Sequence, residues 1–417
     1  DRHSPSLLFT MTEQPYLIDV AISVPIDGPF TYRVPEQLIP MVEIGRRVLV
    51  PFRNKIRTGF IVGRPEQQPD LSPEHIRDVQ DIPDEPLYLT PDLWRFILWV
   101  AEYYLLPNGL VLKTALPPGS DKQSKPWAIL TAEGRTWFGG KGDGTGPELP
   151  LKLLRNGYMQ LRELQQEIGH ELVEAAMKQG WLNVEERLAR PRIVLRNKRL
   201  PELLYPAGSA SSPSSPPPQL TADQHIAVQA ILDAIDKGGF HPFLLFGVTG
   251  SGKTEVYLRA IQETLNRGLQ ALVLVPEIAL TPQLARRFLR RLGGGIALFH
   301  SGLTPSQRHD EWRRIRSGAV SVVIGARSGI FVPLERLGLI VVDEEHDQSY
   351  KQEDSCPYHA RDMALARAKL QNATVILGSA TPSFETFVNA QKGKITRLNL
   401  PTRHHGGNLP VVELVDL

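Results

Sequence analysis

The sequence is poor in cysteine, with a single one, Cys356, among its 417 residues. One thiol can form neither an intrachain disulfide nor a multi-cysteine zinc site, and this usage is typical of a cytoplasmic protein. Long apolar runs are also missing, so no segment has the length needed to cross a bilayer. The apolar residues Leu7–Phe9 are too few for the core of a signal peptide. Neither export nor membrane insertion is therefore indicated.

An excess of charge of one sign is lacking too. The chain holds 47 Lys and Arg against 45 Asp and Glu, for a formal net charge of +2. Overall charge therefore predicts no polyanionic partner, and any surface for nucleic acid must be local. The hydrophobic fraction of 41% and charged fraction of 22% are typical of globular domains, and the length suffices for two or three of them.

The chain begins with Asp1, and Met11 is a candidate translation start, so we expect residues 1–10 to be upstream or disordered sequence. The clearest internal boundary is the stretch AGSASSPSSPPPQ at 207–219. Ser and Pro in this density cannot build a core, and we predict an exposed linker over 201–219. It separates two parts with different patterns.

The first part, residues 11–119, is expected to be β-rich with a helix near its end. Short β-branched and aromatic runs between residues 15 and 63 alternate with Pro and Gly. Residues 90–106 predict a helix, with Thr90 as the cap and Pro91 at the first position.

Residues 120–200 contain helix-period patterns at 158–168 and 171–182, followed by a polar segment. This order resembles a winged-helix domain, and a generic three-helix spacer is an equally good interpretation.

Residues 220–417 alternate apolar β runs with helical stretches, which predicts an α/β domain with a parallel sheet covered by helices on both faces. Ligands of such sheets bind at the carboxyl ends of the strands. Each apolar run here ends in a glycine or polar cluster.

The motif GVTGSGKT at 247–254 fits the phosphate-binding loop G-x-x-x-x-G-K-[ST]. Its backbone can surround phosphate at the start of a helix, its lysine can neutralise the β and γ phosphates, and its threonine can bind Mg²⁺. A glycine turn beside a solvated lysine is the alternative. The predicted nucleotide-binding residues are Gly247, Thr249, Gly250, Ser251, Gly252, Lys253 and Thr254.

A second motif, LIVVDEEH at 339–346, places carboxylates at the end of an apolar strand. Asp343 would help Thr254 to hold Mg²⁺, and Glu344 would orient and activate the attacking water. Lys253, Asp343 and Glu344 are thus the predicted catalytic residues. An acidic loop is the alternative, which the preceding phosphate motif disfavours.

These motifs, with GSATPS at 378–383, resemble those of superfamily 2 helicases. Together with VPEIALTPQ, DEEHDQSYKQE, YHARD, PFTYRVP, GRRVLVPF and RTGFIVG, they resemble the bacterial primosomal replication-restart helicases over nearly all of residues 15–417. The resemblance implies a β-rich domain that binds DNA 3′ ends, a winged helix, and the first RecA-like helicase lobe. It also implies an ATP- and Mg²⁺-dependent 3′-to-5′ DNA helicase that initiates replication restart at stalled forks.

The resemblance also implies roles for individual residues. Gln224 would read adenine, while His346, Ser379, Ala380 and Thr381 would couple nucleotide state to DNA binding. Arg327, in GARSGIF, would contact DNA, or it braces its loop. Thr281 and Gln283 would lie near the DNA backbone, and His300 is assigned no role.

Tyr350 and Tyr358 lie in a loop that is aromatic-rich in the family, and they would stack on exposed bases. The alternative, in which both tyrosines pack on the lobe, is close to equal.

Phe30 matches the aromatic residue that stacks on the terminal 3′ base. The family has an aspartate and a glycine where this chain has Thr31 and Arg53, so strict selectivity for a 3′ hydroxyl is in question. Arg53, Lys55 and Arg57 form a basic cluster that either contacts DNA or is a solvated hairpin tip.

By the same resemblance, a second lobe, zinc-binding cysteines and a C-terminal domain would follow, so we expect a fragment that binds DNA and nucleotide without unwinding. Zn²⁺ is expected only in that further part. Expected partners are DNA forks, single-stranded DNA, single-stranded-DNA-binding protein and primosome loaders. The rival interpretations are another superfamily 2 fork-remodelling or RNA helicase, and a motor-inactive DNA-binding scaffold.

Overall fold

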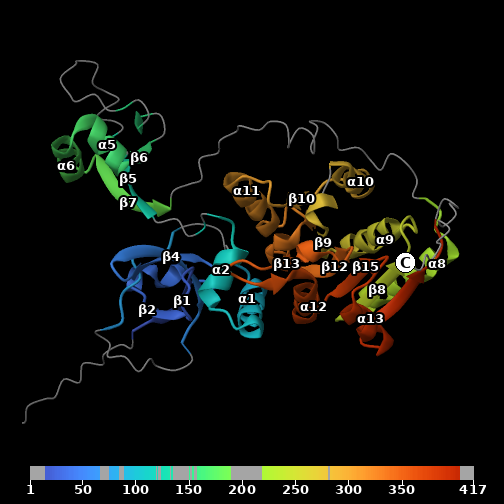
Figure 1. Ribbon diagram of the computed structural model, residues 1–417. Coiled ribbons are helices and arrows are strands. Elements are labelled where there is room, and N and C mark those ends of the chain that lie inside the picture. The colour runs from blue at the N-terminus through green and yellow to red at the C-terminus, as the bar shows by residue number, and fades with distance from the viewer. Residues whose placement is uncertain are drawn as a thin grey trace, which may run out of the picture. The chain divides into compact units, whose positions relative to one another are not determined.

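The computed structural model describes residues 15–65, 75–83, 89–118, 120, 124–131, 133–134, 150, 153–154, 157–188, 218–279 and 282–403. These residues form two compact units (Figure 1). One contains residues up to 87, apart from 24–26, and residues 120–190. The other contains residues 24–26, 88–119 and 191–417. The predicted module at 11–119 is thus divided between the units, and most of the predicted linker at 201–219 lies outside the described residues.

The first unit contains a four-stranded antiparallel sheet, here called the sheet module. Its strand order is β2-β1-β4-β3. The strands are β1 (Leu17–Ile22), β2 (Phe30–Arg33), β3 (Arg47–Phe52) and β4 (Lys55–Gly63), with a 3-10 turn at Glu36–Met41. Ile18, Val20, Val48, Val50 and Phe60 are fully buried in its core. The β prediction for residues 15–63 is confirmed.

The same unit contains a smaller module. Its strands are β5 (Ser124–Leu130), β6 (Tyr158–Gln160) and β7 (Leu182–Leu188), and its helices are α5 (Leu161–Ile168) and α6 (His170–Lys178). The strands form an antiparallel sheet in the order β6-β5-β7. The pattern at 158–168 is therefore a short strand followed by a helix, and the winged-helix assignment stays a prediction.

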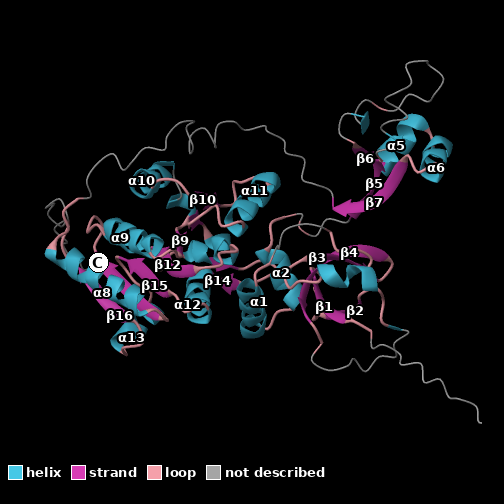
Figure 2. Cartoon of the chain, turned by 180° about the vertical axis from the view of Figure 1, so that it is seen from behind, coloured by secondary structure: helices cyan, strands magenta, loops and turns pink. Residues whose placement is uncertain are grey.

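The second unit is built on a seven-stranded parallel sheet of order β10-β11-β9-β12-β15-β8-β16 (Figure 2). This sheet and the helices that cover it, residues 218–403, are here called the lobe. The strands are β8 (His241–Gly247), β9 (Gln270–Leu274), β10 (Ile296–Phe299), β11 (Val322–Gly325), β12 (Leu337–Asp343), β15 (Thr374–Ser379) and β16 (Thr396–Leu400). The parallel α/β prediction is confirmed. Only β16, an edge strand with three exposed residues, is absent from the predicted runs.

Helices cover the sheet of the lobe, as the alternating sequence predicts. They are α8 (Ala222–Lys237), α9 (Lys253–Asn266), α10 (Pro282–Leu292), α11 (Pro305–Arg316), α12 (Ala360–Leu370) and α13 (Phe384–Gln391). One apolar core joins α9 and α10 to the sheet through fully buried side chains such as Ile261, Phe288 and Val341. Between β12 and α12, the chain forms an antiparallel hairpin of β13 (Lys351–Gln352) and β14 (Tyr358–His359).

Two helices that precede the lobe in sequence belong to the same unit: α1 (Pro91–Tyr104) and α2 (Asn108–Ala115). Thr90 caps α1 through its side chain, as predicted. The Phe96 ring lies 5.8 Å from that of Phe331, and the Tyr104 hydroxyl accepts a 3.0 Å hydrogen bond from the His359 amide. Residues some 250 positions apart thus form one body. Among the described residues, no helix is both long and apolar enough to span a membrane.

Candidate nucleotide site and DNA-contact residues

The phosphate-loop motif occupies the turn between β8 and α9, as predicted from the sequence. Gly250 and Gly252 have φ values of +82° and +84°, which residues with a Cβ adopt at a cost. A Cβ on Gly252 would also come within 2.3 Å of the Gln224 amide nitrogen. The chain can follow this tight turn only because glycine stands at these positions.

The loop fits a bound phosphate group. In the described part of the chain, the backbone N–H groups of Gly252, Lys253 and Thr254 have no protein acceptor, and they open a 14-residue helix. The Ser251 hydroxyl is buried there without a hydrogen-bond partner. Unpaired donors at a helix N-terminus favour an anionic oxygen. Gly247 ends β8 just before this turn, and Thr249 is exposed within it.

The Lys253 side chain crosses the loop and is 9% exposed. Its ammonium donates a 2.9 Å hydrogen bond to the Gly247 carbonyl and lies 3.7 Å from a Glu344 oxygen. The structure therefore brings together the predicted phosphate-neutralising lysine and the predicted water-activating glutamate.

Asp343 ends β12 beside the loop, and Tyr257 of α9 holds it in place. The Tyr257 hydroxyl donates a 2.9 Å hydrogen bond to Asp343 Oδ1, and burial raises the pKa of both groups. Space for this tyrosine depends on Gly378, because a Cβ there would lie 1.6 Å from the hydroxyl. Asp343 and Thr254 can supply oxygen ligands to the Mg²⁺ of a bound nucleotide. Nothing in the motif pointed to Tyr257.

Glu344 follows in a left-handed conformation, with φ at +46°. A non-glycine residue in this region is strained, and such strain is common at functional sites. Its second carboxylate oxygen lies 3.8 Å from His346 Nδ1.

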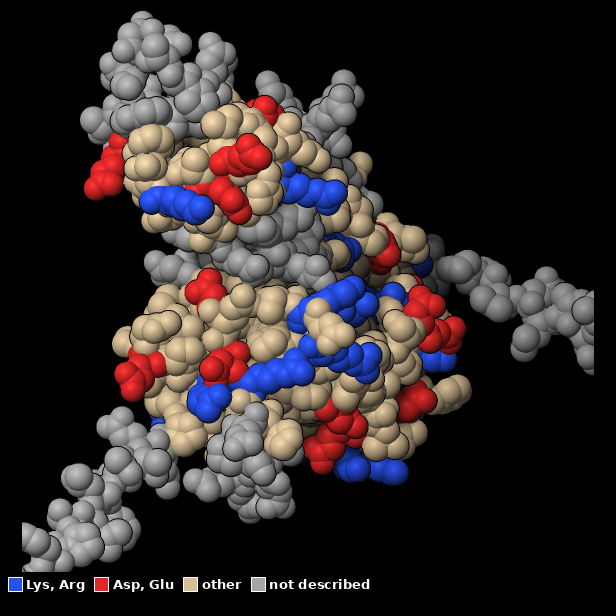
Figure 3. Space-filling view, turned by 90° about the vertical axis from the view of Figure 1, so that its left-hand side faces the viewer, with Lys and Arg blue, Asp and Glu red and all other residues tan. Residues whose placement is uncertain are grey.

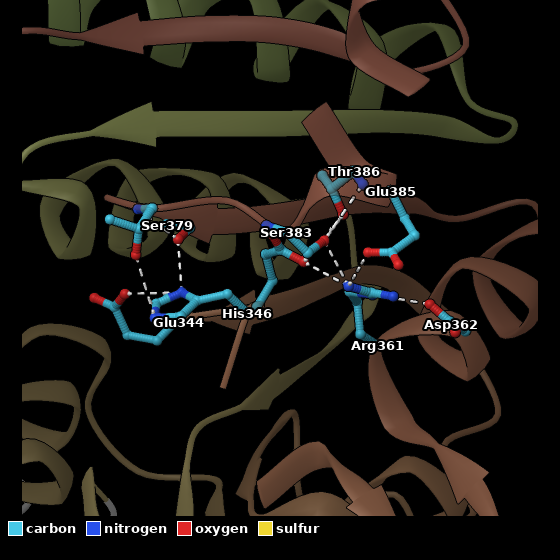
Figure 4. A network of polar contacts seen from close by, with 10 residues as sticks. Glu344, His346, Arg361, Asp362, Ser379, Ser383, Glu385 and Thr386 are labelled. Atoms are coloured by element: carbon cyan, nitrogen blue, oxygen red, sulfur yellow. Dashed lines mark hydrogen bonds and ion pairs between the residues drawn. The ribbon is translucent and has the colours of Figure 1, made fainter. Parts of the chain in front are cut away.

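His346 connects this acidic turn to the SAT turn after β15. Its Nδ1 lies 2.8 Å from the Ser379 hydroxyl, and its Nε2 lies 3.4 Å from the Thr381 hydroxyl (Figure 4). The Ser379 hydroxyl also accepts from the Thr381 amide at 3.0 Å, across Ala380. The four predicted coupling residues are thus adjacent, and their role in coupling stays a prediction.

Glu345, between the predicted catalytic Glu344 and the predicted coupling residue His346, has a fully buried side chain and was assigned no role from the sequence. Its carboxylate accepts hydrogen bonds from the Ser383 amide at 2.7 Å, the Thr386 hydroxyl at 3.0 Å and Arg361 at 3.3 Å. Arg361 also donates to Ser383 Oγ and to Asp362 (Figure 4). This cluster joins the end of β12 to α12 and the start of α13, so a shift of the acidic turn would disturb both helices.

Gln224 is 2% exposed, and both ends of its side-chain amide are in use. Its oxygen accepts from the Thr221 amide at 3.0 Å in a capping box, and its nitrogen donates to the Ser251 carbonyl at 2.8 Å. These contacts brace the phosphate loop, while a contact with adenine stays a prediction.

Tyr350 and Tyr358 are 0% and 2% exposed, so neither offers a ring face to a base. Tyr350 donates a 2.7 Å hydrogen bond to the Asp343 carbonyl, and the Tyr358 ring packs edge-on against Phe331 at 5.5 Å. Stacking needs an exposed face, so their burial favours the packing alternative over the predicted base contact. Arg327 donates to the Lys351 carbonyl at 2.6 Å, which fits its bracing alternative.

In the sheet module, the half-buried Phe30 packs edge-on against Phe52, with 5.1 Å between ring centroids. Thr31 lies beside it and donates a 2.7 Å hydrogen bond to Asp19 of the paired strand β1. A carboxylate therefore stands next to Thr31 although the aspartate expected at position 31 is absent. The proximity of Asp19 to Thr31 follows from the pairing of β1 with β2 and could not be predicted from the sequence.

Arg53 occupies the tip between β3 and β4 with φ at +53°, where the family has glycine. It is exposed, its guanidinium carbon lies 5.8 Å from the Phe52 ring centroid, and its carbonyl accepts from Arg77 at 2.7 Å. Within the described residues, no carboxylate pairs with Arg53, Lys55 or Arg57. Figure 3 shows Lys and Arg side chains in a band across the visible face of the sheet module. The geometry is compatible with DNA contact, which stays a prediction.

Two protein-family models match the chain. The 3′DNA-binding domain (3′BD) of PriA matches residues 19–117, and the DEAD/DEAH box helicase matches residues 221–389. The first match covers the sheet module from Asp19 onward, together with α1 and α2.

Curated relatives match nearly the whole chain. Replication restart protein PriA of Bacillus subtilis is 33% identical over 452 residues, covering 94% of this chain and 56% of the relative. The proteins of the same name from Synechocystis and Haemophilus influenzae are 36% and 35% identical, covering 94% and 93% of this chain. The chain spans about half the length of these relatives, 55% and 52% in the last two cases.

Solved helicase structures match the chain with lower similarity. RecG bound to a three-way DNA junction is 27% identical with a TM-score of 0.37, covering 47% of this chain and 25% of that protein. DEAD-box helicase Mss116 bound to ssRNA and UDP-BeF is 18% identical with a TM-score of 0.33, covering 44% and 40%. The family models and the curated relatives confirm the resemblance: over nearly its whole length the chain is similar to replication restart protein PriA, with a match to the 3′ DNA-binding domain ahead of a match to the DEAD/DEAH box helicase.

Proposed function

We infer that this chain is the fork-binding and nucleotide-binding part of an ATP-dependent, 3′-to-5′ DNA helicase that initiates replication restart. The observation that carries this proposal is the convergence of three motifs on the carboxyl ends of the adjacent strands β8, β12 and β15. A phosphate loop, an acidic turn and the SAT turn are joined there by direct contacts, as a nucleotide-driven switch requires.

The roles proposed for the site residues follow from the hydrogen-bond donors, charges and oxygen ligands that they offer to ATP and Mg²⁺. ATP supplies the phosphoanhydride bond, and Mg²⁺ neutralises its phosphates. The loop amides and Lys253 would bind the β and γ phosphates, while Thr254 and Asp343 would hold the metal ion. Glu344, beside Lys253, would orient a water molecule. His346 would pass a change at this turn to Ser379 and Thr381.

The sheet module is proposed to bind the 3′ end of a DNA strand at a fork. Phe30 offers part of an aromatic face to a terminal base, and Thr31 with Asp19 offers oxygen acceptors to a sugar hydroxyl. Arg53 would contact the backbone. This assignment rests on the family match at 19–117 and on the contacts of these residues.

A RecA-type motor also needs a second lobe that supplies an arginine to the transition state. The described lobe should therefore bind nucleotide and DNA but hydrolyse ATP slowly. By resemblance, single-stranded-DNA-binding protein and primosome loaders are the expected protein partners, and the cytoplasm is the expected compartment.

The test uses two binding measurements on the same chain. We expect a fluorescent ATP analogue to bind with Mg²⁺ and to lose affinity at least tenfold in Lys253→Ala. We also expect a forked DNA to bind more tightly than an RNA fork of the same sequence. Preference for the RNA fork would favour an RNA helicase, and absence of nucleotide binding would favour a DNA-binding scaffold.

A further inference from the structure

Helix α10 carries an unusual concentration of positive charge. Four of its eleven residues are arginine, none is acidic, and no other lobe helix is so one-sided. Three of these side chains, Arg286, Arg287 and Arg290, belong to exposed residues. They are called the α10 arginines below.

The fold separates these arginines from the apolar side of the helix. Ala285 and Phe288 are 1% and 0% exposed, and three leucines of α10 pack against the same core. At 100° per residue, the α10 arginines and Gln283 fall within an arc of about 100° on the opposite side. Burial of the apolar side fixes the rotation of α10, so the arginines are held toward solvent.

Elsewhere in the lobe, several arginines have carboxylate partners, whereas Arg308, Arg313 and Arg367 have none among the described residues. Arg267 lies 2.6 Å from Asp236, Arg314 lies 2.7 Å from Glu311, and Arg361 contacts Glu345. On α10 itself, Arg291 reaches Glu255 at 2.8 Å, a carboxylate already shared with Arg259.

For the α10 arginines, no carboxylate partner exists within the described residues. Arg286 and Arg290 also stand four positions apart, where like charges destabilise a helix. An external anion would offset this repulsion.

We propose that the α10 arginines bind the phosphodiester backbone of nucleic acid. Arginine binds phosphate through paired N–H groups and stays charged at any physiological pH. Residues 286 and 290 are about 6 Å apart along the helix axis. Phosphates follow one another at about 3.4 Å of rise per strand, so the side chains can reach neighbouring phosphates. The inference rests on the DNA-binding part of the proposed function and adds a contact outside the motifs.

The salt dependence of binding measures this contact directly. Each backbone phosphate that is neutralised changes the slope of log K against log[salt] by about 0.9 for duplex DNA and about 0.7 for a single strand. Three lost contacts would reduce the slope by about 2.7 or about 2.1. Between 50 and 200 mM salt, the unaltered chain should then lose about 40-fold more affinity for duplex, or about 20-fold more for a single strand, than the variant.

The experiment compares Arg286→Gln/Arg287→Gln/Arg290→Gln with a control of equal charge change, Lys237→Gln/Lys392→Gln/Lys394→Gln. All six residues are exposed in the lobe, so both variants should keep the melting temperature of the unaltered chain. Fluorescence anisotropy is recorded from 50 to 200 mM salt with a forked DNA, a duplex and a single strand.

A reduced slope for the arginine variant alone supports the proposal, and the probe with the larger change identifies whether duplex or single strand is held. Equal slopes for both variants, with the fork still bound, overturn the proposal and leave the proposed function intact. That outcome would assign the α10 arginines to solvent or to an acidic protein. Failure of the unaltered chain to bind any DNA would overturn both.

Discussion

Replacing the buried Glu345 by alanine should destabilise the lobe strongly, because it breaks the contact of the acidic turn with α12 and the start of α13. The carboxylate is 0% exposed and Arg361 is 9% exposed, so neither charge has much access to water. Alanine would leave the Arg361 guanidinium, the Ser383 amide and the Thr386 hydroxyl without their shared acceptor.

Removing one partner of a buried ion pair costs about 3–5 kcal/mol. Arg361 keeps contacts with Asp362 at 2.8 Å and Glu385 at 3.9 Å, which are 40% and 72% exposed. We therefore expect the low end, about 3 kcal/mol. Glu345→Gln keeps an acceptor but loses the charge, and should cost about 1–2 kcal/mol, since neutral hydrogen bonds are about half as strong as charged ones.

Glu385→Ala is the matched control, because it removes the same kind of side chain from the same arginine at an exposed site. An exposed ion pair contributes about 0–1 kcal/mol. Amide hydrogen exchange in β12 and β15 reports unfolding of the lobe without assuming that the two units unfold together. If Glu345→Ala proved no more destabilising than Glu385→Ala, the buried cluster would not hold the acidic turn to α12 and α13 as described.

Two further predictions concern the same lobe. Burial lowers the pKa of both His300 and His359, so the unfolded chain binds more protons as pH falls below about 6.5. Melting curves should therefore show the lobe losing stability between pH 7.5 and 5.5, more steeply than in His300→Gln/His359→Gln; parallel curves would contradict this. Gly378→Ala should destabilise the lobe by about 1–3 kcal/mol through its clash with Tyr257, and Tyr257→Phe should restore part of the loss in denaturant titrations. No rescue would mean that the clash lies elsewhere.

The alternation of strands and helices in the lobe and the position of the nucleotide site could be predicted because both depend on local patterns. Apolar runs ending in glycine or acidic residues mark the strands, and parallel strands carry these ends to one edge. The burial of Tyr350 and Tyr358 could not be predicted from local patterns. The sequence of an aromatic loop is the same whether its rings face solvent or pack on the lobe.

Other features depend on contacts between distant parts of the chain. Tyr104 and His359 meet across 255 positions, and Glu345 meets Thr386 across 41. Asp19 lies beside Thr31 only because β1 and β2 pair in that register. Neither hydrophobic periodicity nor a short motif predicts contacts between residues far apart in the sequence. The roles of Tyr257, Glu345 and Asp19 could therefore be identified only from the structure.

Recognition of a DNA 3′ end by the sheet module is the central claim, and the affinity of the chain for two forked DNAs tests it most directly. The forks differ only in a 3′ hydroxyl or a 3′ phosphate on the leading-strand end at the branch, and the salt concentration is fixed. We predict tighter binding to the hydroxyl, with the difference lost in Phe30→Ala and kept in Tyr103→Ala, an exposed aromatic residue outside the module. Equal affinity for the two forks in the unaltered chain would contradict the account.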